Sequence, residues 1–221
     1  KIGRRLAIKV LNAAKFVLSF PVPDGATITH ALDASMLATL DGVVRDATRA
    51  CEAYDHARAL ELTEAFFWTF CDDYLELVKE RAYASGGPGQ ASAVAALRTA
   101  IDVLLRLLAP VLPFATEEVW RWTHEGSVHT APWPTVAELG DASAPRGLLT
   151  AVSAALIGIR RAKTDAKASQ KTEVVSATLA GPAILAEAAD DLRAVGRIAE
   201  LTLVEAPEVA VNGIVLAEQP A

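Results

Sequence analysis

The sequence contains very little cysteine: Cys51 and Cys71 are the only two in 221 residues, and no Cys-x-x-Cys pair occurs. Two isolated thiols exclude a disulfide framework and a cysteine-rich metal site, and they favour a reducing compartment, which we expect to be the cytoplasm. Of the four histidines, only His124 and His129 lie close together, and no second pair of ligands accompanies them. We therefore expect no metal site.

The chain also lacks an apolar run of about eighteen residues, the length that a membrane-spanning helix requires, so we expect no association with a membrane. It opens on Lys1 without Met and without the apolar region of a signal peptide, and we expect a piece of a longer protein. No Gly-rich phosphate-binding loop is present. Hydrophobic residues make up 52% of the chain and include much Ala, which allows a sizeable core of closely packed helices.

Positive charge is scarce overall, since the net charge is −6, and this argues against a general nucleic-acid binder. The basic residues are nevertheless concentrated in two places. Residues 1–23 hold five of them and no acid, and residues 156–171 hold five against Asp165 alone. Two basic patches on an acidic protein could bind a polyanion at a defined place, although two solvated helix faces would give the same pattern.

One stretch, Glu64–Arg81, organises the predicted fold. Its aromatic and aliphatic residues recur at helical spacing, and no Gly or Pro interrupts them. A helix with so much aromatic surface has to be buried on several sides, so we expect it at the centre of a helical bundle. The helix should run from residue 56 to about residue 83, with Asp55 as its N-cap.

The remaining pattern predicts a mainly α protein in two parts, a helical bundle over residues 1–145 and a small α/β module over residues 146–221. Further bundle helices are expected at residues 3–20, 31–53, 91–108 and 115–122, with Trp133 packed against them. In the module we expect a helix over 147–168, a short helix over 182–194, strands over 173–179 and 198–204, and an antiparallel hairpin over 209–216. The turn of that hairpin is predicted at Asn212-Gly213, between β-branched runs.

The first helix has a surface suited to RNA. Arg5, Lys9, Asn12 and Phe16 advance along one face at spacings of four, three and four. Cations bind phosphates, an amide offers a donor and an acceptor to a base edge, and an aromatic ring offers a stacking surface. A core role for Phe16 and a helix–helix contact for Asn12 would fit the same spacing.

Several separated motifs together resemble the valyl-tRNA synthetase family of class I aminoacyl-tRNA synthetases, over residues 1 to about 135. These motifs are LNAAKFVL at 11–18, FWTFCDDYLELVK at 67–79, LLRLLAPVLPFATEEVW at 104–120 and APWP at 131–134. The string from Phe70 to Glu76 favours valine over the isoleucyl and leucyl relatives, which share the other elements. Two features depart from the family: Asp73 stands where a second Trp is usual, and no coiled-coil heptads end the chain.

The resemblance implies the anticodon-binding region of such an enzyme, an anticodon-binding helical bundle, with the anticodon stem-loop of tRNA(Val) as its partner. It further implies that ATP and Mg act in a catalytic domain of the same parent chain, with which this region would also be in contact. The His-Ile-Gly-His and Lys-Met-Ser-Lys-Ser signatures of that domain are absent here. We therefore expect no catalytic residue and no cofactor in this chain, and no activity from it alone.

The candidate tRNA-binding residues combine this resemblance with the charge pattern. Asn12 is expected at a base edge and Phe16 in a base stack. Phosphate contacts are expected from a set of cations: Arg4, Arg5, Lys9, Lys15, and on the same surface Lys79 and Arg81. The 147–168 helix, which also bears Lys167, could contact the tRNA body or the parent catalytic domain, and its candidate residues are Arg160, Arg161 and Lys163.

Three alternatives remain open from the sequence. The chain could be the equivalent region of an isoleucyl enzyme, or a helical module that binds another protein through its Ala-rich faces. A catalytic site could instead use the carboxylates of Asp72, Asp73 and Glu76, although no nucleophile, metal set or His partner accompanies them on that helix.

Overall fold

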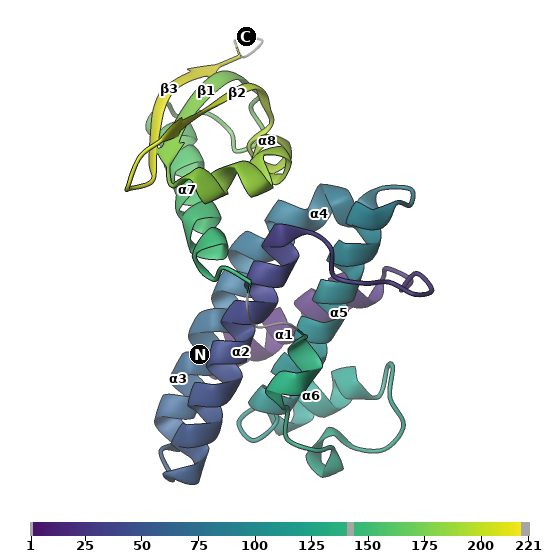
Figure 1. The fold of residues 1–221 in the computed structure, drawn as a ribbon. Helices are drawn as coiled ribbons and strands as arrows, with labels where there is room; N and C mark the ends of the chain where they lie inside the picture. Colours follow the sequence, from purple (N-terminus) through teal and green to yellow (C-terminus); the bar gives the residue numbers. More distant parts are fainter. Residues whose placement is uncertain (1, 141–143, 218–221) are drawn as a thin grey trace.

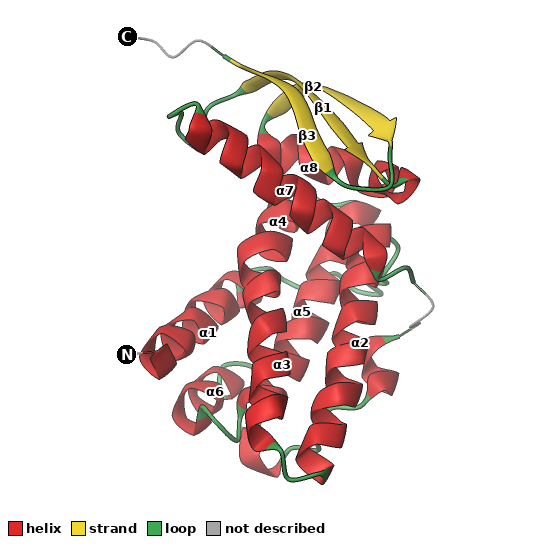
Figure 2. Ribbon diagram, turned by 90° about the vertical axis from the view of Figure 1, so that its left-hand side faces the viewer, coloured by secondary structure: helices red, strands yellow, loops and turns green. Residues whose placement is uncertain are grey.

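The computed structural model describes residues 2–140 and 144–217, which form a helical bundle and, above it in Figure 1, a small helix-and-sheet module. The bundle helices are α1 (Ile2–Leu18), α2 (Ala31–Glu52), α3 (His56–Thr69), α4 (Leu75–Tyr83), α5 (Pro88–Leu108) and α6 (Pro113–Trp120). In Figure 2, α2, α3 and α5 run side by side along the bundle, and α1 lies at a slant to them. The predicted bundle is confirmed.

The predicted central helix is present as one continuous helical stretch with an irregular middle. Between α3 and α4 lies a π-helical turn, η1 (Phe70–Tyr74), which adds a residue to the turn without breaking the helix. At its start, Asp55 acts as the predicted N-cap, since its Oδ1 accepts a hydrogen bond from the backbone N–H of Arg58 at 3.0 Å. Its aromatic stripe is buried as expected, with Phe67, Phe70 and Tyr74 fully enclosed.

The connection after α6 packs along the bundle through two short 3-10 helices, η2 (Val128–Thr130) and η3 (Val136–Leu139). Between them, the indole Nε1–H of Trp133 donates to Thr48 Oγ1 of α2 at 2.9 Å. Trp133 is therefore packed against the bundle, as predicted from its place between two prolines.

The C-terminal module consists of α7 (Gly147–Asp165), β1 (Val174–Gly181), η4 (Ala183–Ala188), α8 (Ala189–Gly196), β2 (Ile198–Glu205) and β3 (Ala210–Leu216). Its sheet has the order β2-β1-β3, with β1 parallel to β2 and antiparallel to β3. The helices α7 and α8 lie between the sheet and the bundle (Figure 2). The predicted fold class, mainly helical with a small α/β module, is thus confirmed.

The predicted hairpin at Asn212-Gly213 is wrong. A single strand, β3, runs through both residues and pairs with the central strand β1. The pairing shifts there: Thr178 lies opposite Asn212, whereas Ser176 lies opposite Val215. Gly213 has a φ of +59°, so the flexible dipeptide forms a bulge within the strand. The same residue types serve bulges and two-residue turns, and the pairing with β1 decides between them.

The module is docked on the bundle by polar contacts as well as by apolar packing. Ser35 Oγ of α2 donates to the carbonyl of Pro145 at 2.7 Å and accepts from the N–H of Leu149 at 3.0 Å. Arg146 reaches back to Asp41 Oδ2 at 3.0 Å. The division at residue 145 stays a prediction. Among the described residues, none of the helices is both long enough and apolar enough for a bilayer crossing.

Candidate nucleic-acid interface

The outer face of α1 gathers the six candidate residues of the first helix. At about 100° per residue, they fall within an arc of about 140°. The members are Arg4, Arg5, Lys9, Asn12, Lys15 and Phe16. Arg4, Arg5, Asn12 and Lys15 are exposed, and the opposite side of the helix is buried in the core. We call these six residues the α1 face.

Two cations of the α1 face are held by the neighbouring helical stretch. Arg5 Cζ lies 4.8 Å from the ring centroid of Trp68, and Lys9 Nζ lies 5.9 Å from it. Lys9 Nζ also lies 2.7 Å from Asp72 Oδ1. These contacts orient both cations, and cation–π contacts of this kind leave the outer side of a guanidinium available to a phosphate. Sequence reasoning assigned Trp68 to the core, whereas the structure leaves it half-buried beside α1.

Phe16 is neither a fully buried core residue nor a fully exposed stacking surface. It is half-buried, and its ring lies 5.1 Å from that of Phe20 and 6.0 Å from that of Tyr83, both edge-to-face. Lys79 Nζ lies 5.8 Å from the Phe16 ring centroid. The α1 face therefore continues into α4 through Lys79, as predicted. The exposed Tyr83 is an aromatic residue that sequence reasoning missed.

Arg81 does not share the surface of Lys79, in contrast to the prediction. Its side chain is 17% exposed and forms ion pairs with Asp33 of α2 and Asp191 of α8. Residues two apart on a helix are separated by about 200°, so Arg81 points away from the surface that Lys79 occupies.

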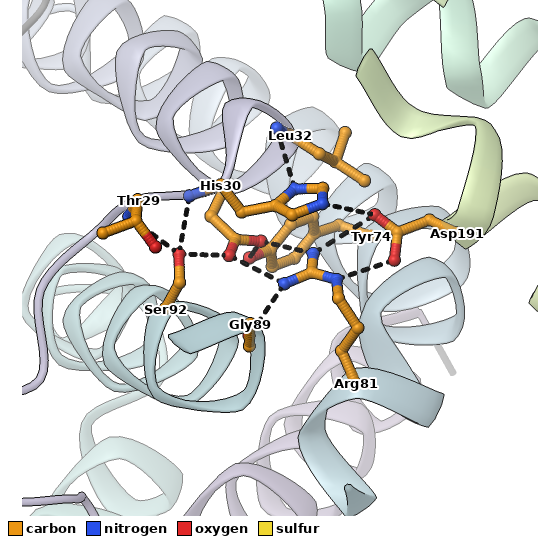
Figure 3. A network of polar contacts seen from close by, with 9 residues as sticks. Thr29, His30, Leu32, Tyr74, Arg81, Gly89, Ser92 and Asp191 are labelled. Carbon is orange, nitrogen blue, oxygen red and sulfur yellow. Dashed lines mark hydrogen bonds and ion pairs between the residues drawn. The ribbon is translucent and has the colours of Figure 1, made fainter. Parts of the chain in front are cut away.

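Arg81 is the centre of the buried polar network in Figure 3. Its Nε donates to Asp191 Oδ1 at 2.7 Å, and its Nη2 donates to Asp33 Oδ1 at 2.8 Å. Asp33 also accepts from Tyr74 Oη at 2.8 Å and from Ser92 Oγ at 2.7 Å. Burial raises the pKa of Asp191, and the guanidinium of Arg81 offsets this effect only in part. The network joins the bundle to the C-terminal module.

The three candidates on α7 have three different environments. Arg160 donates to the backbone carbonyl of Asp72 at 2.9 Å and to Asp73 Oδ1 at 3.3 Å, so it lies beside the α1 face. Arg161 is 81% exposed and lies near Asp165. Lys163, expected on the surface, is instead buried. Its ammonium donates to the backbone carbonyls at positions 196 and 170, at 2.8 and 3.2 Å, which replaces the water it loses.

The carboxylates considered for catalysis are bound by cations. Asp72 pairs with Lys9, Asp73 with Arg160, and Glu76 with Lys79. Burial raises the pKa of Asp73, which faces α7 through Arg160. Within residues 2–140 and 144–217, no group of three potential ligands is placed to hold a metal ion. The arrangement offers ion pairs and stacking surfaces, which suit binding.

Residues 33–179 match the family model described as the anticodon-binding domain of tRNA ligase. The chain belongs to this family. The matched range extends from α2 through α7 into β1 and so includes part of the C-terminal module.

The most similar curated relatives indicate which kind of tRNA ligase this chain resembles. The chain is 60% identical to the valine–tRNA ligase of Leifsonia xyli subsp. xyli, over all of this chain and 26% of that protein. It is 54% identical to the valine–tRNA ligase of Thermobifida fusca, over 91% of this chain and 24% of that protein. It is 46% identical to the valine–tRNA ligase of Cutibacterium acnes, over 100% of this chain and 26% of that protein. The chain spans about a quarter of the length of these relatives. The predicted resemblance to the anticodon-binding region of valyl-tRNA synthetases is confirmed, and an isoleucyl relative is not favoured.

Proposed function

We propose that this chain is the part of a cytoplasmic valine–tRNA ligase that binds the anticodon stem-loop of tRNA(Val). In this proposal, ATP- and Mg-dependent aminoacylation belongs to a catalytic domain of the same parent chain, and this region supplies affinity and anticodon recognition. Membership of the anticodon-binding family supports the RNA partner. The names of the most similar curated relatives support valine.

The observation that supports the place of binding is the composition of the α1 face. It presents an exposed amide, Asn12, between exposed cations, and the half-buried Phe16 ring lies at its edge. A splayed loop base can stack on an aromatic ring while its polar edge bonds to an amide. Arg4 and Lys15 lie about 16 Å apart along α1, so they are placed to contact phosphates of different nucleotides around such a base.

The neighbouring residues would orient this surface for the RNA. Trp68 and Asp72 hold Arg5 and Lys9 in position, so less side-chain entropy is lost when they bind a phosphate. Lys79 extends the positive surface past Phe16. Arg81 and Lys163 are left out of this surface because both are engaged inside the protein.

A binding titration tests the proposal. The chain is titrated with an anticodon stem-loop RNA carrying the valine anticodon, at low and at moderate salt. The double variant Asn12→Ala/Lys15→Ala should weaken binding on the order of tenfold, and the loss of a phosphate contact should reduce the salt dependence. Arg58→Ala is the matched control, since Arg58 is an exposed cation on α3, about 15 Å along the helix from Trp68.

Each outcome decides a separate part of the proposal. Equal affinity for the valine anticodon and for a scrambled loop would contradict anticodon recognition. Preference for an isoleucine anticodon would contradict the valine assignment. If the chain bound the RNA but the double variant behaved like wild type, the α1 face would be the wrong surface. No binding of the RNA at all would favour a protein-binding module.

A further inference from the structure

A second surface lies next to the α1 face, in a groove between the bundle and the C-terminal module. The groove has a volume of about 400 Å³ and is lined by α4 on one side and by α7, α8 and the segment after α7 on the other. It is therefore formed only where the two parts of the chain meet. Sequence reasoning could not find it, because its walls are about 80–120 residues apart.

Most of the charged residues that line this groove are basic. Lys79 and Arg160 lie on the walls near the α1 face, and Lys171 and Arg197 lie on the module. Lys79, Lys171 and Arg197 are exposed. The acids of the lining belong to α4: Glu76 and Glu80. The module side therefore presents positive charge without a carboxylate among the lining residues.

The two module cations, Lys171 and Arg197, lie side by side because the side chain of Arg197 contacts the main chain of Lys171. Arg197 Nη1 donates to the carbonyl of Lys171 at 3.2 Å. Beneath them, the ammonium of Lys163 joins the carbonyls of Gln170 and Gly196, the residues that directly precede the two cations. Gln170 Nε2 in turn donates to the carbonyl of Arg160 at 3.1 Å. A buried lysine thus fixes two neighbouring backbones, each with a cation pointing toward solvent.

The backbone of Arg197 allows its side chain to be removed without added strain. Arg197 follows α8 in the left-handed conformation, with a φ of +53°. Glycine is the residue that adopts this helix-ending conformation at the least steric cost. An arginine here retains a strained backbone, as Lys167 does with the same φ, so glycine at position 197 should relieve strain.

The groove is continuous with the α1 face. Lys79, which lines the groove, has its Nζ 5.8 Å from the Phe16 ring centroid. Arg160, also in the lining, bonds to the carbonyl of Asp72, and the side chain of Asp72 pairs with Lys9. A chain of phosphates that leaves the α1 face would meet Lys79 and Arg160 at the groove, in competition with their carboxylate partners Glu76 and Asp73.

We propose that this groove binds the sugar–phosphate backbone of the same RNA whose loop bases lie on the α1 face. The inference rests on the proposed function and extends it to a second surface, with phosphate as the ligand chemistry and Lys171 and Arg197 as the contacting residues. The network of Arg81, Asp33 and Asp191 fixes the distance between the two walls, since it joins α4 to α8. Backbone contacts of this kind supply affinity and register without reading sequence.

The variant Arg197→Gly tests this directly. It removes the cation and places glycine in the left-handed conformation, so the thermal midpoint should stay the same or rise. With Lys171→Ala added, affinity for an unmodified tRNA(Val) transcript should fall on the order of tenfold, and the slope of log affinity against log salt should decrease by about 1–2. The loss should be equal for a scrambled anticodon, because phosphate contacts carry no sequence information.

Lys167→Gly is the matched control. Lys167 is an exposed cation of the same module and also has a φ of +53°, but it does not line the groove. It should leave the RNA affinity within about twofold of wild type, since a single unpaired surface charge contributes little.

The two proposals fail in different ways. If wild type binds and Asn12→Ala/Lys15→Ala weakens binding, but Lys171→Ala/Arg197→Gly does not, the groove inference is overturned and the proposed function stands. An equal loss in Lys167→Gly would also overturn it, because general charge would then explain the effect. If wild type shows no affinity for the tRNA, the proposed function itself fails.

Discussion

Replacing Arg81 with methionine, which has a similar length and no charge, should strongly destabilise the protein. The change removes four hydrogen bonds from the guanidinium to Asp33 and Asp191. Both carboxylates are at most 2% exposed. Without the guanidinium, Asp33 would keep only hydroxyl donors, and Asp191 would keep only His30 Nε2 at 3.8 Å. Removal of one partner from a buried ion pair costs about 3–5 kcal/mol, which for a chain of this length corresponds to a fall of roughly 6–20 °C in the thermal midpoint.

Urea unfolding at two pH values measures this loss and identifies its cause. In Arg81→Met, Asp191 loses its main counter-charge and keeps only His30 Nε2, at 3.8 Å, so its pKa, which burial already raises, should lie further above the unfolded value of about 3.9. A raised carboxyl pKa stabilises the folded state below the unfolded pKa, and this contribution is lost as pH rises through the folded pKa. The difference in the free energy of unfolding between wild type and variant should thus be large at neutral pH and small near pH 4.

Asp191→Asn is the companion variant. Burial already raises the pKa of Asp191 in the wild type, because the Arg81 guanidinium offsets the loss of hydration only in part. The amide keeps an acceptor for Arg81 and removes the excess charge, so the cost should be only about 1–2 kcal/mol. A loss below about 1 kcal/mol for Arg81→Met, or an equal loss at both pH values, would refute the account of the network.

Two further predictions concern single sites. Burial raises the pKa of Cys71 to about 12, so iodoacetamide should modify the half-buried Cys51 first in the native protein, and peptide mapping that found Cys71 modified first would contradict its enclosed position. Asp55→Ala should lower the free energy of unfolding by about 1 kcal/mol because it removes the N-cap of α3, whereas Asp55→Asn should retain most of the stability in urea unfolding. Equal losses in the two variants would argue against a capping role.

The helices of the bundle could be predicted from sequence because local spacing determines them. Phe67, Phe70 and Tyr74 have helical spacing, and burial of that stripe follows from their size. Asp55 was also predictable, since a carboxylate directly before a helix satisfies its free N–H groups. The π turn was not, because the added residue is accommodated by packing around η1 and leaves no mark in the spacing.

The errors arose where distant segments meet. Asn212-Gly213 has the local properties of a turn, and only its pairing with β1 makes it a bulge. Arg81 has the sequence properties of a surface cation, and its partner Asp191 lies 110 residues away. Lys163 also has the sequence properties of a surface cation, and its partners are backbone carbonyls at positions 170 and 196, which the sequence does not reveal.

The candidate site could be predicted only where its residues lie on one helix. The α1 face belongs to one helix, so its residues could be assigned to one side from spacing alone. The contribution of Trp68 could not be found, because a Trp near an aromatic stripe is expected in the core. Lys171 and Arg197 lie in connections whose neighbours only the folded chain defines.

Lysine footprinting with and without RNA tests the central claim most directly. The chain is acetylated alone and in complex with the valine anticodon stem-loop, and the modified peptides are quantified by mass spectrometry. Bound RNA should protect Lys15 of the α1 face and the neighbouring Lys79, whereas the exposed Lys167 should keep its reactivity. Protection of Lys167 with unchanged reactivity of Lys15 and Lys79 would contradict that claim.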